Sequence, residues 1–151
     1  VAKGALSEGA DVIGVIPEFL KKKELSYEGI THNYVVSTMH ERKAKMDELS
    51  DAVIALPGGY GTMEELFEML TWAQLALHKK PIGLLNTDGF YEPLVALSEK
   101  MIEKKFLKEE YRNLMIIESD IDKLLNEMEA YTPLANDKWF ETQNAPLNIN
   151  L

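Results

Sequence analysis

The fold class follows from one stretch near the middle of the chain, Asp51-Ala-Val-Ile-Ala-Leu-Pro-Gly-Gly-Tyr-Gly-Thr-Met-Glu-Glu65. Its first six residues form a short apolar run, which is typical of a buried strand. The glycine-rich segment that follows predicts a tight turn, and Thr62 is expected to begin a long helix that reaches about Leu77. A strand that passes through a short turn directly into a helix is the repeating unit of parallel α/β proteins.

The same alternation of strand and helix continues on both sides of this stretch. Thr38 and Glu41 fit a capping box, which predicts a helix that begins at Met39. The order of elements predicts a doubly wound α/β fold, with a mostly parallel sheet and helices on both faces. Strands are expected over 11–17, 33–37, 51–56, 81–85 and 114–117, helices over 1–9, 39–49, 62–77, 91–105 and 121–131, and loops over 18–29 and 86–89.

The length of 151 residues suits one globular domain, which we expect over residues 1–131. Residues 132–151 are rich in proline and asparagine and lack periodicity, so we interpret them as an extended C-terminal tail. Two alternatives remain open for this tail. Trp139 and Phe140 could anchor it on another surface, such as a partner subunit, or the tail could be mostly mobile.

The charge balance excludes some classes of function. The chain has 16 basic and 25 acidic residues and a net charge of −9, so its field repels nucleic acid and anionic membranes. It contains no cysteine, which excludes disulfides, thiolate zinc sites and a cysteine nucleophile, and which suits a cytoplasmic location. Its histidines show no metal-ligand spacing, so neither a metal nor a cofactor is expected. No apolar run approaches the roughly 20 residues of a membrane span.

The glycine-rich turn is the first candidate site. Its three glycines permit positive φ and a close approach to the backbone, and a helix N-terminus supplies free N–H donors for an anion. The turn is neither a Walker loop nor a G-x-G-x-x-G motif, and a plain strand–helix turn is the alternative. Glu65 also has two interpretations: Thr62-x-x-Glu65 is itself a capping box, but a carboxylate at an anion site could polarise water.

The second candidate is the segment Met39-His40-Glu41-Arg42-Lys43, which follows a predicted strand. Arg42 offers a planar fork for phosphate or carboxylate, and Lys43 offers a point charge. The alternative is two solvated cations on a helix. Thr71, Trp72 and Gln74 lie further along the long helix, where packing or a partner contact is the default interpretation.

Taken together, the two motifs resemble the LOG ("lonely guy") family. The pattern Pro57-Gly-Gly-x-Gly-Thr-x-x-Glu65, preceded by Met39-x-x-Arg42-Lys43, carries the resemblance, which extends from Val1 to about Tyr131. It includes Ile16-Pro17, Thr71-Trp-Ala-Gln74 and Gly83-Leu-Leu-Asn86. Members of this family are Rossmann-like cytokinin riboside 5′-monophosphate phosphoribohydrolases. They hydrolyse the N-glycosidic bond of N6-modified adenosine monophosphates to the free base and ribose 5-phosphate, and several bacterial members also cleave AMP.

The resemblance implies a role for particular residues. Arg42 and Glu65 match the two catalytic positions. It further implies a cytoplasmic homodimer, and a strand and glycine-rich loop ahead of Val1 that this chain lacks. Nucleotide-contacting positions are matched by Glu24, Arg42, Lys43, Gly59, Tyr60, Gly61, Thr62, Met63, Glu64, Glu65 and Thr71.

Two other functions compete with this expectation. A nucleotide-binding or sensing module of the same fold, without turnover, would use the same loop and basic pair. Some members carry the label of possible lysine decarboxylases, but such an enzyme needs a Schiff-base lysine and a pyridoxal phosphate pocket. Lys43 is the only lysine in a motif, and it adjoins Arg42, so the sequence gives that label little support.

Overall fold

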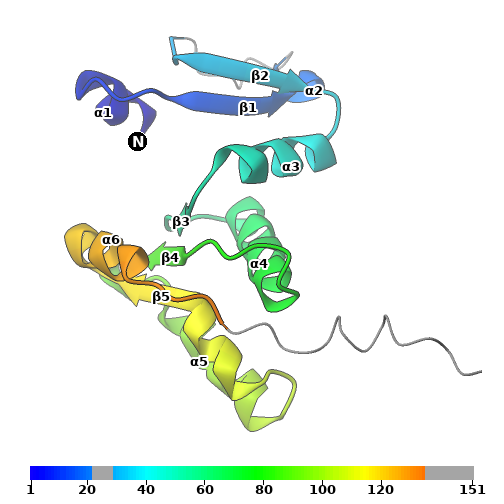
Figure 1. The fold of residues 1–151 in the computed structure, drawn as a ribbon, viewed down its shortest axis with the longest axis vertical. Coiled ribbons are helices and arrows are strands. Elements are labelled where there is room, and N and C mark those ends of the chain that lie inside the picture. Colours follow the sequence, from blue (N-terminus) through cyan, green and yellow to red (C-terminus); the bar gives the residue numbers. More distant parts are fainter. Residues whose placement is uncertain (22–28, 135–151) are drawn as a thin grey trace, which may run out of the picture. The chain divides into compact units, whose positions relative to one another are not determined.

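Parallel strands alternate with helices along the chain, as the sequence predicts (Figure 1). The computed structural model describes residues 1–21 and 29–134. The chain divides into two units, Val1–Asp51 and Ala52–Leu151, and each is considered by itself. The single domain expected over 1–131 therefore stays a prediction, and most of the predicted tail lies outside the described residues.

The first unit is built on two parallel strands. These strands, β1 and β2, pair along their whole length, with Ile13 opposite His32 and Pro17 opposite Val36. The predicted loop over 18–29 is wrong at its start, because a single helical turn follows β1 directly. The elements are α1 (Ala2–Ser7), β1 (Ile13–Pro17), α2 (Glu18–Lys21), β2 (His32–Val36) and α3 (Met39–Leu49).

Helix α3 begins and ends at the predicted residues because its cap forms as expected. The Thr38 Oγ1 accepts a hydrogen bond from the Glu41 N–H at 3.1 Å. In return, the Glu41 Oε2 accepts one from the Ser37 N–H at 2.8 Å, one residue before the usual partner of a capping box. These two bonds fix the start of the helix that carries Arg42 and Lys43.

The second unit contains a three-stranded parallel sheet in the order β3-β4-β5. Val53 lies opposite Ile82 in the first pair, and Ile82 lies opposite Met115 in the second. The 3-10 helix η2 was not predicted. The elements are β3 (Val53–Ala55), α4 (Tyr60–Gln74), β4 (Ile82–Leu85), η1 (Thr87–Gly89), α5 (Glu92–Glu103), η2 (Glu109–Leu114), β5 (Met115–Glu118) and α6 (Ile121–Glu129).

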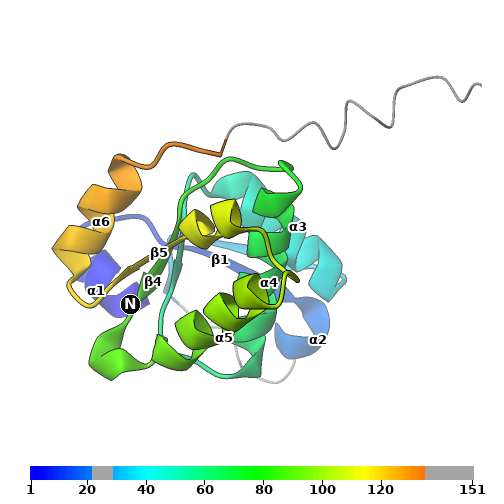
Figure 2. The same ribbon diagram turned by 90° about the horizontal axis from the view of Figure 1, so that it is seen from below.

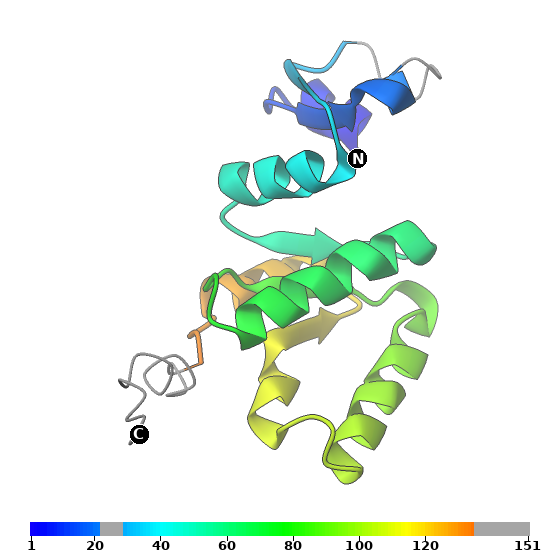
Figure 3. The same cartoon turned by 90° about the vertical axis from the view of Figure 1, so that its right-hand side faces the viewer.

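Helices cover both faces of this sheet (Figures 2 and 3). On one face, the buried side chains of Ala55, Ile82 and Leu84 pack with Leu66 of α4 and with Tyr91, the residue before α5. On the other face, α6 lies directly on β4, since a Cβ added to Gly83 would clash with Met128 and lie 3.2 Å from a Leu124 methyl carbon. The predicted α/β, Rossmann-like class is confirmed.

The bounds of α4 differ from the prediction at both ends. The helix begins at Tyr60, with Gly59 as the N-cap, rather than at Thr62. It ends at Gln74 instead of Leu77, because Ala76 adopts a left-handed conformation with φ of 55°. The Leu77 N–H then donates to the Trp72 carbonyl at 2.9 Å, which closes a Schellman-type cap without the usual glycine. Within residues 1–21 and 29–134, none of the helices combines the length and the apolar character needed to cross a membrane.

Candidate functional site

The glycine loop places an uncapped helix N-terminus at the carboxyl end of β3. Strand β3 ends at Ala55, and after Leu56, Pro57 and Gly58 the chain enters α4 through Gly59. The first intrahelical hydrogen bond runs from the Met63 N–H to the Gly59 carbonyl at 3.1 Å. The N–H groups of Tyr60, Gly61 and Thr62 precede this bond and have no acceptor within the helix. Together with the helix dipole, these donors favour a bound anion.

The three glycines of the loop differ in what their missing side chains allow. None of them adopts the positive φ that glycine permits, so the expected close approach to the backbone is the property that matters here. A Cβ at Gly58 would clash with the Thr62 hydroxyl and lie 2.9 Å from the Thr62 Cβ, so this glycine allows the loop to fold tightly against the first turn of α4. A Cβ at Gly59 or Gly61, by contrast, would meet nothing within 4 Å beyond the adjoining backbone. These two residues leave the backbone donors open to a ligand.

Glu65 does not cap the helix. Because Gly59 is the N-cap, Glu65 falls in the second turn of α4, and no side chain caps the helix start. The capping-box interpretation of Thr62 and Glu65 is therefore wrong. The Glu65 side chain is half-buried, while the neighbouring Glu64 is exposed. The helix cap therefore does not account for the carboxylate at this position, and the chemical role of Glu65 stays a prediction.

Other predicted contact residues on α4 face in different directions. The Tyr60 side chain is 95% exposed. Met63 packs against the buried core of the unit. The Thr71 Oγ1 donates to the Phe67 carbonyl at 2.7 Å, so its hydroxyl is already bonded within its own helix.

In the first unit, Arg42 is held against β1. Its Nε donates to the Val15 carbonyl at 3.2 Å, and the side chain is half-buried. Arg42 and Met39 of α3 line a cavity of about 540 Å³ with residues of β1. Lys43, next along α3, is also half-buried. An arginine anchored through Nε keeps its terminal nitrogens in a fixed plane, as recognition of a flat anion or base requires.

The predicted site residues therefore fall into two sets. Arg42 and Lys43 lie on α3 of the first unit, after β2. Residues 59–65 and Thr71 lie on α4 of the second unit, and the structure brings Gly59, Gly61, Thr62 and Glu65 together in two helical turns. Glu24 lies outside the described residues.

One residue near the loop was not predicted. The Tyr91 hydroxyl donates to the Leu56 carbonyl at 2.7 Å, immediately before Pro57. The sequence pattern predicts only that Tyr91 begins a helix after a loop over 86–89. Its position after a buried strand, at the same sheet edge as the glycine loop, is the signal that could have found it.

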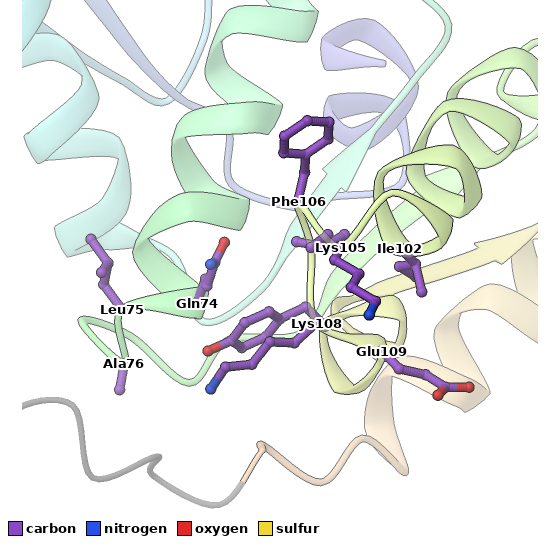
Figure 4. A pocket seen from close by; sticks show the side chains of 10 residues that line it. Gln74, Leu75, Ala76, Ile102, Lys105, Phe106, Lys108 and Glu109 are labelled. Carbon is purple, nitrogen blue, oxygen red and sulfur yellow. The ribbon is translucent and has the colours of Figure 1, made fainter.

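A second cavity, of about 670 Å³, lies at the far end of α4 (Figure 4). Gln74, the last residue of α4, and Ala76 in the turn after it line one side, and Lys105, Phe106 and Lys108 line it from the segment after α5. Since α4 has 15 residues, this cavity is about 20 Å along the helix from the glycine loop. It is distinct from the candidate anion site.

Possible metal ligands were compared across the described part of the chain. There, no three His, Asp or Glu side chains are grouped so that they could hold a metal ion. His78 has a structural place, since its Nε2 lies 2.9 Å from the Met69 carbonyl and its Nδ1 accepts from the Lys80 N–H at 3.2 Å. It ties the end of α4 to the segment leading into β4.

The fold and the loop define a class: Rossmann-like α/β proteins with a glycine loop at a helix N-terminus. Residues 1–128 match the model of a family described as "possible lysine decarboxylase". With the relatives that follow, this match shows that the chain belongs to the LOG family.

The relatives carry one consistent name. The chain is 50% identical over 132 residues to the probable cytokinin riboside 5′-monophosphate phosphoribohydrolase LOGL1 of Oryza sativa subsp. japonica, covering 87% of this chain and 59% of the relative. It is 45% identical to the cytokinin riboside 5′-monophosphate phosphoribohydrolase LOG2 of Arabidopsis thaliana (85% and 61%). It is 40% identical to LOG1 of the same plant (98% and 71%). The chain thus spans less than two thirds of the length of most of these relatives.

The two cavities described in residues 1–21 and 29–134 do not suit the pyridoxal phosphate that a lysine decarboxylase uses. A Schiff-base lysine must be held in a pocket and lose its proton there. The lining of the cavity beside Arg42 includes no lysine among the described residues. Lys105 and Lys108, at the second cavity, are both exposed, and Lys108 pairs with Glu110 at 3.5 Å. Neither cavity therefore offers this cofactor a suitable lysine within the described ranges.

Proposed function

We propose that the protein containing this chain hydrolyses the N-glycosidic bond of adenosine 5′-monophosphate or its N6-modified forms, releasing the free base and ribose 5-phosphate. The observation that carries the proposal is the open first turn of α4, with Glu65 one turn further along, in a chain whose relatives are named phosphoribohydrolases. A nucleotide-binding or sensing module would need the donors but has little use for the carboxylate.

The 5′-phosphate binds at the start of α4 in this proposal. The N–H groups of Tyr60, Gly61 and Thr62 donate to it, and the open space beside Gly59 and Gly61 admits it. Local N–H donors of this kind are needed because the chain carries a net charge of −9, which repels phosphate at a distance. Lys43, Glu64 and Glu24 remain proposed contacts. Met63 and Thr71 receive less support, since one packs in the core and the other bonds its own helix.

The chemical step needs a carboxylate and a group that stabilises the departing base. Water attacks C1′ of the ribose, and the C1′–N9 bond breaks with its electron pair passing to the base. Glu65 stabilises the positive charge that develops on the ribose ring and takes a proton from the water. The departing base gains a proton from a water molecule, Glu65 then gives up to solvent the proton that it took, and Arg42 steadies the charge on the base.

Turnover of single variants tests these assignments. In the full-length protein, we expect Arg42→Ala and Glu65→Gln each to lower kcat by about 100-fold or more. Glu65→Gln keeps the shape of the side chain and disturbs no helix cap, and its unfolding is measured alongside its turnover. Glu68→Gln, a half-buried glutamate on the same helix, is the control and should retain activity. Near wild-type turnover in both Arg42→Ala and Glu65→Gln would overturn the assignment.

A homodimer and a cytoplasmic location are also proposed. The dimer is supported by α4, whose apolar side chains are not confined to the buried face: Leu66 is buried, but Phe67 is 40% exposed. Light scattering of the full-length protein should give twice the mass of its chain, and the mass of a single chain would refute the dimer. Cell fractionation tests the location.

A further inference from the structure

We infer that Tyr91 is a positioning residue for the glycine loop: its hydroxyl holds the Leu56 carbonyl and thereby aims the backbone donors at the start of α4. That those donors receive a 5′-phosphate rests on the proposed function. The positioning itself rests on contacts within the second unit.

Tyr91 belongs to a buried cluster that includes residues of both elements flanking the loop. Its side chain is only 1% exposed and packs in one cluster with Ala55, the last residue of β3, and Leu66, in the second turn of α4. Its hydroxyl donates to the Leu56 carbonyl at 2.7 Å. The Tyr91 side chain thus lies in the cluster that joins the strand before the loop to the helix after it, and its hydroxyl bonds the backbone at the point where the loop begins.

The loop has few groups of its own with which to hold that position. Pro57 has no N–H, and Gly58 and Gly59 have no side chains. The helix start also has no side-chain cap. The Leu56 carbonyl is therefore a natural anchor point, and a small rotation there would redirect the N–H groups of residues 60–62.

Tyr91 is itself fixed to the sheet. Its N–H donates to the Asn86 Oδ1 at 2.7 Å, and the Asn86 Nδ2 donates to Glu92 at 2.8 Å. The Asn86 N–H donates to the Glu118 carbonyl at the end of β5, also at 2.8 Å. A chain of hydrogen bonds therefore links β5 and the end of β4 to the glycine loop after β3. Burial also raises the pKa of Tyr91, which keeps its hydroxyl a donor at neutral pH.

Tyr91→Phe tests the inference, because it keeps the ring and removes only the hydroxyl. In the full-length protein, we expect KM and Kd for adenosine 5′-monophosphate to rise about tenfold, with kcat changed by less than about twofold. Binding of adenosine, which lacks the phosphate, should not change. In the ligand-free protein, the first N–H groups that are bonded within α4, at residues 63–65, should exchange faster, while those of α6 exchange at the same rate.

Two control variants separate positioning from stability. Tyr111→Phe removes a hydroxyl elsewhere in the unit, and Met128→Ala destabilises the sheet from the face covered by α6. Neither should alter KM. If Tyr91→Phe does not fold, Asn86→Ser loosens Tyr91 without touching its ring and should show the same rise in Kd and in exchange.

Unchanged KM, Kd and amide exchange in a folded Tyr91→Phe protein would overturn the inference. A wild-type protein that binds the monophosphate but releases no base would refute the proposed function alone, because the binding and exchange comparisons would still report on Tyr91. If the wild-type protein binds no monophosphate, the amide exchange of residues 63–65 in Tyr91→Phe still decides whether Tyr91 positions the loop.

Discussion

Among single residues, Gly61 gives the sharpest separation of ligand binding from folding. It lies in the first turn of α4, has no left-handed backbone, and has open space where a Cβ would be. Alanine is favoured over glycine in a helix by up to about 1 kcal/mol, so Gly61→Ala should raise the free energy of unfolding. Its methyl group would project beside the N–H donors, and we expect affinity for adenosine 5′-monophosphate to fall about tenfold.

Thermal unfolding and calorimetric titration together check this prediction. Gly4→Ala is the matched control, since Gly4 is also helical, in α1, and also has open space. It should gain stability without any change in affinity. A stabilised Gly61→Ala protein that binds the monophosphate as tightly as the wild type would show that the ligand does not approach this turn.

The sequence could predict which residues belong to the candidate site better than it could predict their contacts. The glycines and Glu65 stand out because their types suit an anion site and a carboxylate chemistry. The sequence could not predict at which of the three positions a side chain would be excluded. That depends on Thr62, which lies against Gly58 only in the folded chain. The role of Tyr91 could not be predicted for the same reason: its partner, Leu56, is 35 residues away in sequence.

At the level of elements, the two long helices after β2 and β3 show where sequence patterns succeed and where they mislead. Helix α3 begins where predicted because Thr38 caps it as the spacing indicates, although the Glu41 side chain accepts from the Ser37 N–H instead of the Thr38 N–H. The same spacing at Thr62 and Glu65 predicted a false start for α4, because Gly59 had already begun the helix. The end of α4 could not be predicted, since alanine rarely adopts the left-handed conformation that Ala76 takes.

The junction between β3 and α5 should respond to alkaline pH through Tyr91. Burial raises its pKa above the ordinary value of 10.0. Above pH 10.0, the unfolded chain loses this proton before the folded protein does, so the free energy of unfolding falls as pH rises toward the folded pKa. Below pH 10.0 the buried neutral phenol makes its full contribution to the free energy of unfolding.

Unfolding by urea on both sides of pH 10.0 measures this effect. The stability difference between wild type and Tyr91→Phe should shrink as pH rises through the window. Tyr131, whose pKa burial also raises, is present in both proteins and cancels. A difference that is constant with pH would show that the Tyr91 phenol ionises equally in the two states.

For the whole molecule, the alternation of strand and helix was sufficient to predict a parallel α/β fold. It could not predict the division at Asp51, because alternation describes the order of elements and not how many contacts join them. The net charge of −9 limits the kinds of binding site that can be expected. It disfavours an extended basic surface, and a phosphate would instead be bound by backbone N–H groups. The proposed reaction rests on the names of the relatives, since neither the charge nor the fold specifies a reaction.

The central claim is tested most directly by incubating the full-length protein with AMP and with isopentenyladenosine monophosphate, and following the products by chromatography. The proposal predicts free base and ribose 5-phosphate in equal amounts from at least one of the two, and the ratio of rates identifies the preferred base. A folded protein that binds these nucleotides and releases no base from either would contradict it, and would favour a nucleotide-binding module instead.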